Sequence, residues 1–72
     1  MSLTQSVNGK TVQVISINAS YDHVTRLAAM GILAGAKMQV VNNSLHEAAL
    51  VECKGTRWAI GRGLPNQIEV TD

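Results

Sequence analysis

Hydrophobic and polar residues alternate along five short stretches of this chain. These stretches cover residues 11–17, 37–42, 49–54, 56–60 and 68–70. Alternation with a period of two places every second side chain on the same face of a β-strand. The first stretch, TVQVISI, is also rich in the β-branched residues that favour strands. The pattern therefore predicts five strands, each turning one face toward a core.

The side chains expected to face the core follow from this alternation. In the first strand Val12 and Val14 share one face, whereas Ile15 and Ile17 share the other. Either both faces of this strand are partly covered, or a bulge shifts its phase. The residues expected to point inward from the other strands are Met38, Val40, Ala49, Val51, Cys53, Trp58, Ile60, Ile68 and Val70.

A short helix is expected over residues 21–30, between the first two strands. Ser20 can cap its first turn through the side-chain oxygen, and Gly31 stands where a left-handed C-terminal cap favours glycine. An apolar stripe at helical spacing is formed by Val24, Leu27 and Ala28. A helix of this length needs a surface to pack against.

Five strands and one helix predict a mainly β fold, built as one domain over residues 1–72. We expect a small five-stranded barrel with the helix inserted after the first strand. Closure of the barrel would leave no unpaired strand edges. Turn residues separate the elements at Asn8-Gly9, at the polar tip 42–47 and at Lys54-Gly55, and residues 61–66 are expected to form a loop or a single helical turn.

Composition narrows the function classes. The chain has 72 residues, 46% of them hydrophobic and 15% charged, as in a folded domain. A net charge of +1 with scattered basic residues argues against nucleic-acid binding. One cysteine cannot form an internal disulfide, and no apolar run approaches the ~20 residues of a membrane span. With no signal peptide in the sequence, we expect a cytoplasmic protein without membrane insertion.

One stretch is specific enough to suggest a family. Residues 26–41 read RLAAMGILAGAKMQVV, which resembles the signature of the ferrous iron transport protein A (FeoA) family. The similarity continues through Lys54-Gly55 and Ala59-Ile60 and closes at Ile68 and Val70, so it covers about residues 8–71. Two features depart from the family pattern. The tip 44–48 lacks the usual glycine and prolines, and the basic stretch after the fourth strand is reduced to Arg62.

The resemblance implies an SH3-like barrel that serves as an accessory factor of bacterial ferrous iron uptake. Such proteins are not enzymes, and they are thought to contact the cytoplasmic GTP-binding region of the FeoB transporter. The sequence leaves open whether the chain also forms a homo-oligomer. An alternative is a metal-sensing or ligand-binding module, related to the SH3-like C-terminal domain of iron-dependent repressors.

Apolar residues of the helix, connectors and loops are the candidate partner-binding residues. They are Leu27, Met30, Ile32, Leu33, Leu45 and Leu64. An exposed cluster of this kind would form a docking patch, and the alternative is that they cap the open ends of the barrel. Trp58 is expected in the core rather than at an interface. Arg26 and Arg57 could face an acidic partner surface or simply be solvated.

No catalytic, cofactor or metal residues are predicted. Cys53 lies on the inward face of its strand, as a small buried hydrophobic residue does. The pairs Asp22-His23 and His46-Glu47 offer metal-ligating groups, but neither has the three or four ligands at fixed spacing that a zinc site shows. Both histidines are therefore expected to be solvated.

Overall fold

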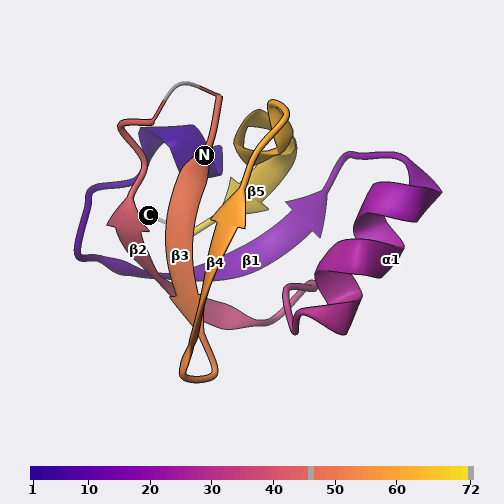
Figure 1. The fold of residues 1–72 in the computed structure, drawn as a ribbon, viewed down its shortest axis with the longest axis horizontal. Helices are drawn as coiled ribbons and strands as arrows, with labels where there is room; N and C mark the ends of the chain where they lie inside the picture. The colour runs from indigo at the N-terminus through magenta and orange to yellow at the C-terminus, as the bar shows by residue number, and fades with distance from the viewer. Residues whose placement is uncertain (46, 72) are drawn as a thin grey trace.

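The five expected strands and the helix are all present. The protein is described here from a computed structural model that covers residues 1–45 and 47–71. The strands are β1 (Thr11–Ile17), β2 (Lys37–Asn42), β3 (Ala49–Cys53), β4 (Thr56–Ile60) and β5 (Ile68–Val70). The helix α1 (Tyr21–Ala29) follows β1, and two short 3-10 helices, η1 (Leu3–Gln5) and η2 (Leu64–Gln67), complete the fold (Figure 1). The mainly β, SH3-like fold class is thus confirmed.

The sheet is antiparallel and open. Its strand order is β4-β3-β2-β1-β5, so β4 and β5 are the two edges. Within the described residues no ladder joins these edges, and the expectation of a closed barrel is wrong in this respect. The segment between β4 and β5 instead turns through η2, in which Pro65 is buried.

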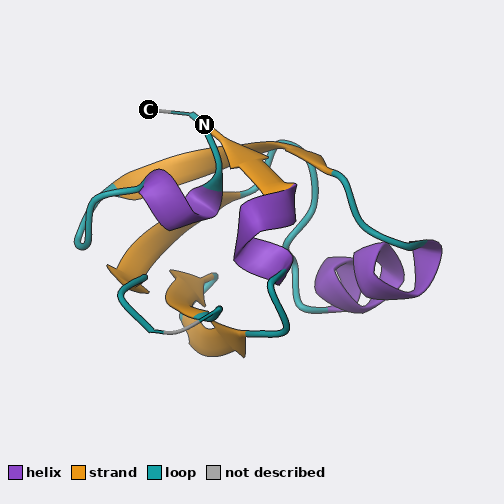
Figure 2. Cartoon of the chain, turned by 90° about the horizontal axis from the view of Figure 1, so that it is seen from above, coloured by secondary structure: helices purple, strands orange, loops and turns teal. Residues whose placement is uncertain are grey.

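The two 3-10 helices take the place of strand closure at one end of the sheet. They pack side by side (Figure 2), and the Thr4 hydroxyl lies 2.9 Å from the Asn66 side-chain oxygen. Leu3 of η1 is fully buried, although its stretch of sequence shows no periodic pattern. The N-terminal segment is therefore part of the core and not a tail.

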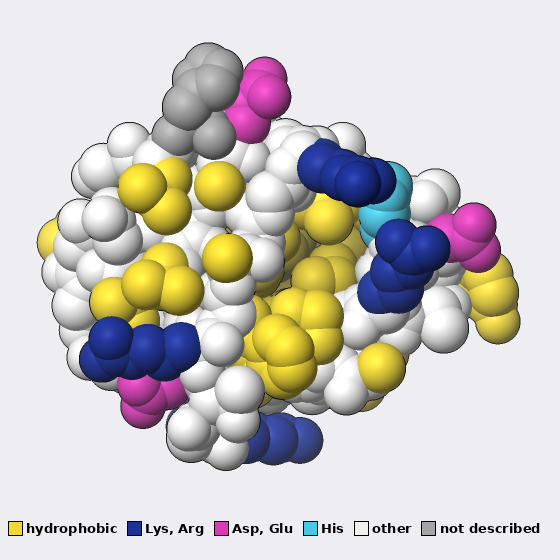
Figure 3. All heavy atoms as spheres, in the orientation of Figure 1, with side chains coloured by type: hydrophobic (Ala, Val, Ile, Leu, Met, Phe, Trp, Pro, Cys, Tyr) yellow, Lys and Arg dark blue, Asp and Glu magenta, His cyan; other side chains and the backbone are white. Residues whose placement is uncertain are grey.

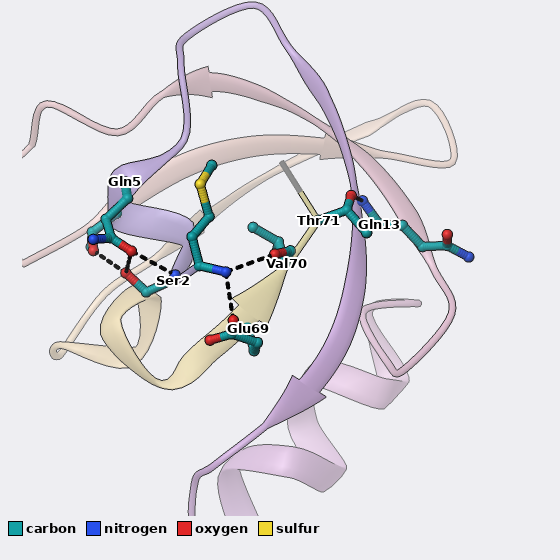
Figure 4. A network of polar contacts seen from close by, with 8 residues as sticks. Ser2, Gln5, Gln13, Glu69, Val70 and Thr71 are labelled. Atoms are coloured by element: carbon teal, nitrogen blue, oxygen red, sulfur yellow. Dashed lines mark hydrogen bonds and ion pairs between the residues drawn. The ribbon is translucent and has the colours of Figure 1, made fainter.

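Polar contacts fix this N-terminal segment to the rest of the fold. The Met1 amino group pairs with the Glu69 carboxylate and also donates to the Val70 carbonyl, at 3.1 Å (Figure 4). From the other side, the Asn43 side-chain amide donates to the carbonyls of Leu3, Thr4 and Ser6. One amide thus reaches three backbone acceptors, of which the Leu3 carbonyl also accepts from the Ser6 N–H within the turn.

The opposite end of the chain is tied down near β1. The Gln13 backbone N–H donates to the Thr71 hydroxyl at 2.9 Å, beyond the end of β5 (Figure 4). Both termini of the described chain therefore lie against the β1–β5 part of the sheet.

The core contains the residues that alternation places inward. Those predicted residues that are buried are Val12, Val14, Met38, Val40, Ala49, Val51, Cys53, Ile60, Ile68 and Val70. Trp58 is half-buried and packs against this cluster from the edge strand β4. The phase question in β1 is settled by a shift in its register with β5 between Val14 and Ser16, which leaves Ile15 exposed.

Helix α1 begins and ends where its capping residues predict. The Ser20 hydroxyl accepts from the His23 backbone N–H at 3.4 Å, and Gly31 has a φ of +86°, which strongly favours glycine. Within the helix only Leu27 is buried, so α1 meets the rest of the protein along a narrow line. That thin contact leaves room for a hollow beside the helix.

Candidate functional site

A groove separates α1 from the segment that leaves β4. Its volume is about 250 Å³. Its lining residues are His23, Arg26, Leu27, Met30, Ala59, Ile60, Gly61, Arg62 and Leu64. Figure 3 shows the hollow with a hydrophobic floor between the helix and the sheet, and with basic side chains on its rim. We refer to it as the α1–β4 groove.

One wall of the groove is a single face of α1 and its C-terminal cap. The four residues on this wall, His23, Arg26, Leu27 and Met30, are spaced at i, i+3, i+4 and i+7. This spacing places them on the same side of a helix. Leu27 and Met30 supply the apolar part of the wall, and Arg26 is exposed.

The other wall is formed by the end of β4 and the loop that follows it. Arg62 in this loop has a φ of +57°, in the left-handed region, and stands between Gly61 and Gly63. The loop is held by the Gly63 N–H, which donates to the Glu47 carbonyl at 3.1 Å, and by the Leu64 N–H, which donates to the Gly61 carbonyl at 3.1 Å. The exposed Arg62 side chain is thus carried by a well-bonded turn.

The charge on the groove is positive and not neutralised. Both Arg26 and Arg62 lack an ion-pair partner in the described part of the chain. Arg57 differs from them, because its guanidinium pairs with the Glu52 carboxylate at 3.2 Å across the β3–β4 ladder. None of the described groove-lining residues is acidic.

The six predicted partner-binding residues separate into three groups. Leu27, Met30 and Leu64 come together in the groove, with Leu27 buried at its floor and the other two partly exposed. Ile32 is fully buried in the core, so its side chain is not available to a partner. Leu33 and Leu45 are 45% and 47% exposed but do not line the groove.

Apart from Leu64, the β4 side of the groove has no counterpart in the predicted site. Ala59, Ile60 and Arg62 are distant from α1 in sequence, and nothing in their local pattern indicates that they face the helix. The one available signal is the basic residue between two glycines at 61–63, which places a charged side chain on a turn.

The candidate metal-ligating and thiol groups that the structure describes do not assemble into a site. Among the described residues no three His, Cys, Asp or Glu side chains come close enough to hold a metal ion. The His23 ring nitrogen Nδ1 lies 3.1 Å from the Ser20 hydroxyl, at the start of α1. His46 lies outside the described residues. Cys53 is buried, with its Sγ 3.5 Å from the Lys37 carbonyl oxygen, as expected for a structural cysteine.

None of the described helices is long and apolar enough to cross a membrane.

Solved structures with the same fold are known. The chain superposes on the solution structure of the FeoA protein from Chlorobium tepidum with a TM-score of 0.86, at 28% identity, over 97% of this chain and 68% of the other. A crystal structure of an iron uptake regulatory protein (FeoA) gives 0.83, at 27% identity, over 97% and 92% of the two chains.

A more distant likeness concerns the fold alone. The structure of ScaR with bound Zn²⁺ superposes with a TM-score of 0.84 at 15% identity, over 100% of this chain and 36% of that one.

Among sequences, a Methanocaldococcus jannaschii protein assigned as an Fe(2+) transport protein A is 39% identical over 64 residues, which are 89% of this chain and 77% of the relative. The FeoA domain family matches residues 1–72, and the chain therefore belongs to that family.

Proposed function

We propose that this protein is a cytoplasmic accessory factor of ferrous iron transport. It acts by binding the cytoplasmic GTP-binding region of a FeoB-type transporter and has no catalytic activity of its own. Membership of the FeoA family and the relative assigned as an Fe(2+) transport protein A support the link to iron transport. The partner and the mode of action are our inference.

The observation that carries the proposal is the α1–β4 groove. It is an open hollow with an apolar floor, and its volume of about 250 Å³ falls below the range of roughly 300–1,000 Å³ typical of small-molecule pockets. A recess of this size suits one or two side chains of a protein partner.

A pair of matched variants tests the placement. Met30→Asp puts a charge on the apolar wall of the groove, whereas Ile15→Asp puts the same charge on β1 at an exposed position that does not line it. We expect Met30→Asp to weaken binding of the cognate transporter's soluble GTP-binding domain by about tenfold or more, because a carboxylate in an apolar contact loses its hydration. Ile15→Asp should leave the affinity unchanged.

The outcomes of this calorimetric titration are distinct. No binding by the unaltered protein would refute the proposed function. Equal affinity of Met30→Asp and the unaltered protein for the domain would show that the groove is not part of the interface. Leu45→Asp, at an exposed leucine outside the groove, tests separately whether the contact extends to the tip between β2 and β3.

The second candidate function is a metal-sensing or ligand-binding module. Its support is the shared fold with the zinc-bound ScaR structure, which at 15% identity concerns architecture only. Titration with Fe²⁺ or Zn²⁺, followed through the ring resonances of His23, distinguishes the two functions. Stoichiometric binding at low micromolar metal would favour the sensing module, and broadening only at high metal concentration would favour the accessory factor.

A further inference from the structure

We propose that the α1–β4 groove recognises an acidic amphipathic helix, whose apolar side chain enters the hollow while its carboxylates meet Arg26 and Arg62. This inference rests on the proposed function, since it names the chemistry of the transporter segment that the groove would bind. Three features of the groove lead to it.

The first feature is the uncompensated charge on the rim. Arg26 projects from α1 and Arg62 from the loop after β4, so the two cations belong to opposite walls of one apolar hollow. Neither has an ion-pair partner among residues 1–45 and 47–71. The nearby Glu47 contributes a backbone carbonyl to the loop, through Gly63. An arrangement of cations around an apolar surface favours a partner of opposite charge.

The second feature is the backbone conformation of Arg62. Its φ of +57° is one that glycine adopts freely and that other residues adopt at a cost of about 1 kcal/mol. Glycines occupy both neighbouring positions, so the loop already tolerates glycine there. Glu47 and Lys54 also have a φ of +53°, so the conformation alone assigns no role; what distinguishes Arg62 is that its strained position lies on the groove, opposite Arg26.

The third feature is the shape of the wall on α1. His23 and Met30 are seven positions apart, which is about 10 Å along a helix at 1.5 Å per residue. This wall presents side chains, and its backbone groups are already bonded within the helix. A partner strand would find no free hydrogen-bonding edge on that wall, whereas a helix needs only side-chain contacts. On the opposite wall β4 is an edge of the sheet, so a partner strand could form backbone hydrogen bonds with that wall only. A helix can contact both walls through side chains, and it is therefore the favoured occupant.

Two synthetic peptides test this chemistry without the transporter. Both have 16 residues and the same leucines at i, i+3, i+4 and i+7. They differ only in carrying glutamates or lysines beside the leucines. We expect the glutamate peptide to shift the amide resonances of residues 23–30 and 59–64 of the ¹⁵N-labelled protein, and to bind at least about tenfold more tightly than the lysine peptide at low salt.

Charge-reversal variants assign this preference to the groove. Arg26→Glu/Arg62→Glu should reduce the affinity for the glutamate peptide by about tenfold. The control Lys10→Glu/Lys37→Glu has the same net charge and alters two exposed residues outside the groove that form no ion pair within the described residues, so it should bind as the unaltered protein does. Arg62→Gly, which relieves the backbone strain, provides a variant whose folding is not at risk.

Each outcome decides the inference. Tighter binding of the glutamate peptide at the groove, lost in the groove variant and kept in the control, would support it. Equal binding of both peptides, binding of neither, or shifts confined to another surface would overturn it. The same variants titrated with the transporter's GTP-binding domain separate the two proposals. If the domain binds every variant equally, the proposed function stands and the acidic-helix inference fails.

Discussion

Leu3 is the most N-terminal residue of the core, and its replacement by alanine tests whether the N-terminal segment stabilises the fold. Its side chain is fully buried within η1. The turn is held by hydrogen bonds from the Gln5 N–H to the Ser2 carbonyl, at 3.0 Å, and from the Ser6 N–H to the Leu3 carbonyl, at 3.1 Å. If this segment is as firmly packed as the sheet, Leu3→Ala should cost as much as a substitution in a central strand.

The expected magnitude follows from the burial. Replacing a fully buried leucine by alanine typically lowers the free energy of unfolding by 2–5 kcal/mol, or about 3 kcal/mol here. A chain of 72 residues has a total stability of about 4–11 kcal/mol, at roughly 0.05–0.15 kcal/mol per residue. Leu3→Ala should therefore remove about a quarter or more of the stability.

Urea unfolding followed by the fluorescence of Trp58, the one tryptophan of the chain, measures this loss. With a slope of about 1 kcal/mol per M urea, the midpoint should fall by about 3 M. Leu33→Ala, at a leucine that is 45% exposed, is the control and should change stability by about 0.5 kcal/mol or less. A loss below about 1 kcal/mol for Leu3→Ala would show that the segment frays and that Leu3 is not an integral part of the core.

Three further predictions concern single residues outside the apolar core. Asn43→Ala should lower the free energy of unfolding by about 1–3 kcal/mol because it removes the side-chain donor to the Thr4 and Ser6 carbonyls, and Asn43→Asp should cost more because it sets a carboxylate against them. Urea midpoints for the pair check both the loss and its order. Gly31→Ala should lower the free energy of unfolding by about 1 kcal/mol or more, because φ is +86° and the added Cβ would lie 3.4 Å from the Lys54 side chain. A thermal melt measures this loss, and an unchanged melting temperature would contradict the left-handed cap. Arg62→Gly should raise stability by up to about 1 kcal/mol while weakening partner binding, and a loss of stability would show that the Arg62 side chain supports the fold.

The sequence determines the strands more clearly than the way they are joined. Alternation identifies the inward faces of β2, β3 and β5, because each of these strands buries one face and leaves the other exposed or only partly buried. Closure is not encoded in such a pattern. Whether β4 meets β5 depends on how η2 turns and on the packing of η1, and these are contacts between segments far apart in the chain. The burial of Leu3 depends on the same contacts.

The candidate site could be predicted only in part. Leu27, Met30 and Leu64 were expected from their apolar character in a helix, at its end and in a loop, and they do meet in one groove. Apolar character alone does not distinguish a groove residue from a core residue. For this reason the predicted site also included Ile32, which is buried in the core. The groove itself arises because α1 contributes only one buried side chain and so stands off from β4.

The most direct test of this account is a map of the surface that the transporter contacts. We would titrate the ¹⁵N-labelled protein with the soluble GTP-binding domain of the cognate FeoB-type transporter, with and without a GTP analogue, and follow the amide resonances. The account predicts shifts concentrated at residues 23–30 and 59–64, the two walls of the groove. Shifts confined to the other side of the sheet, or none at saturating concentrations, would contradict it.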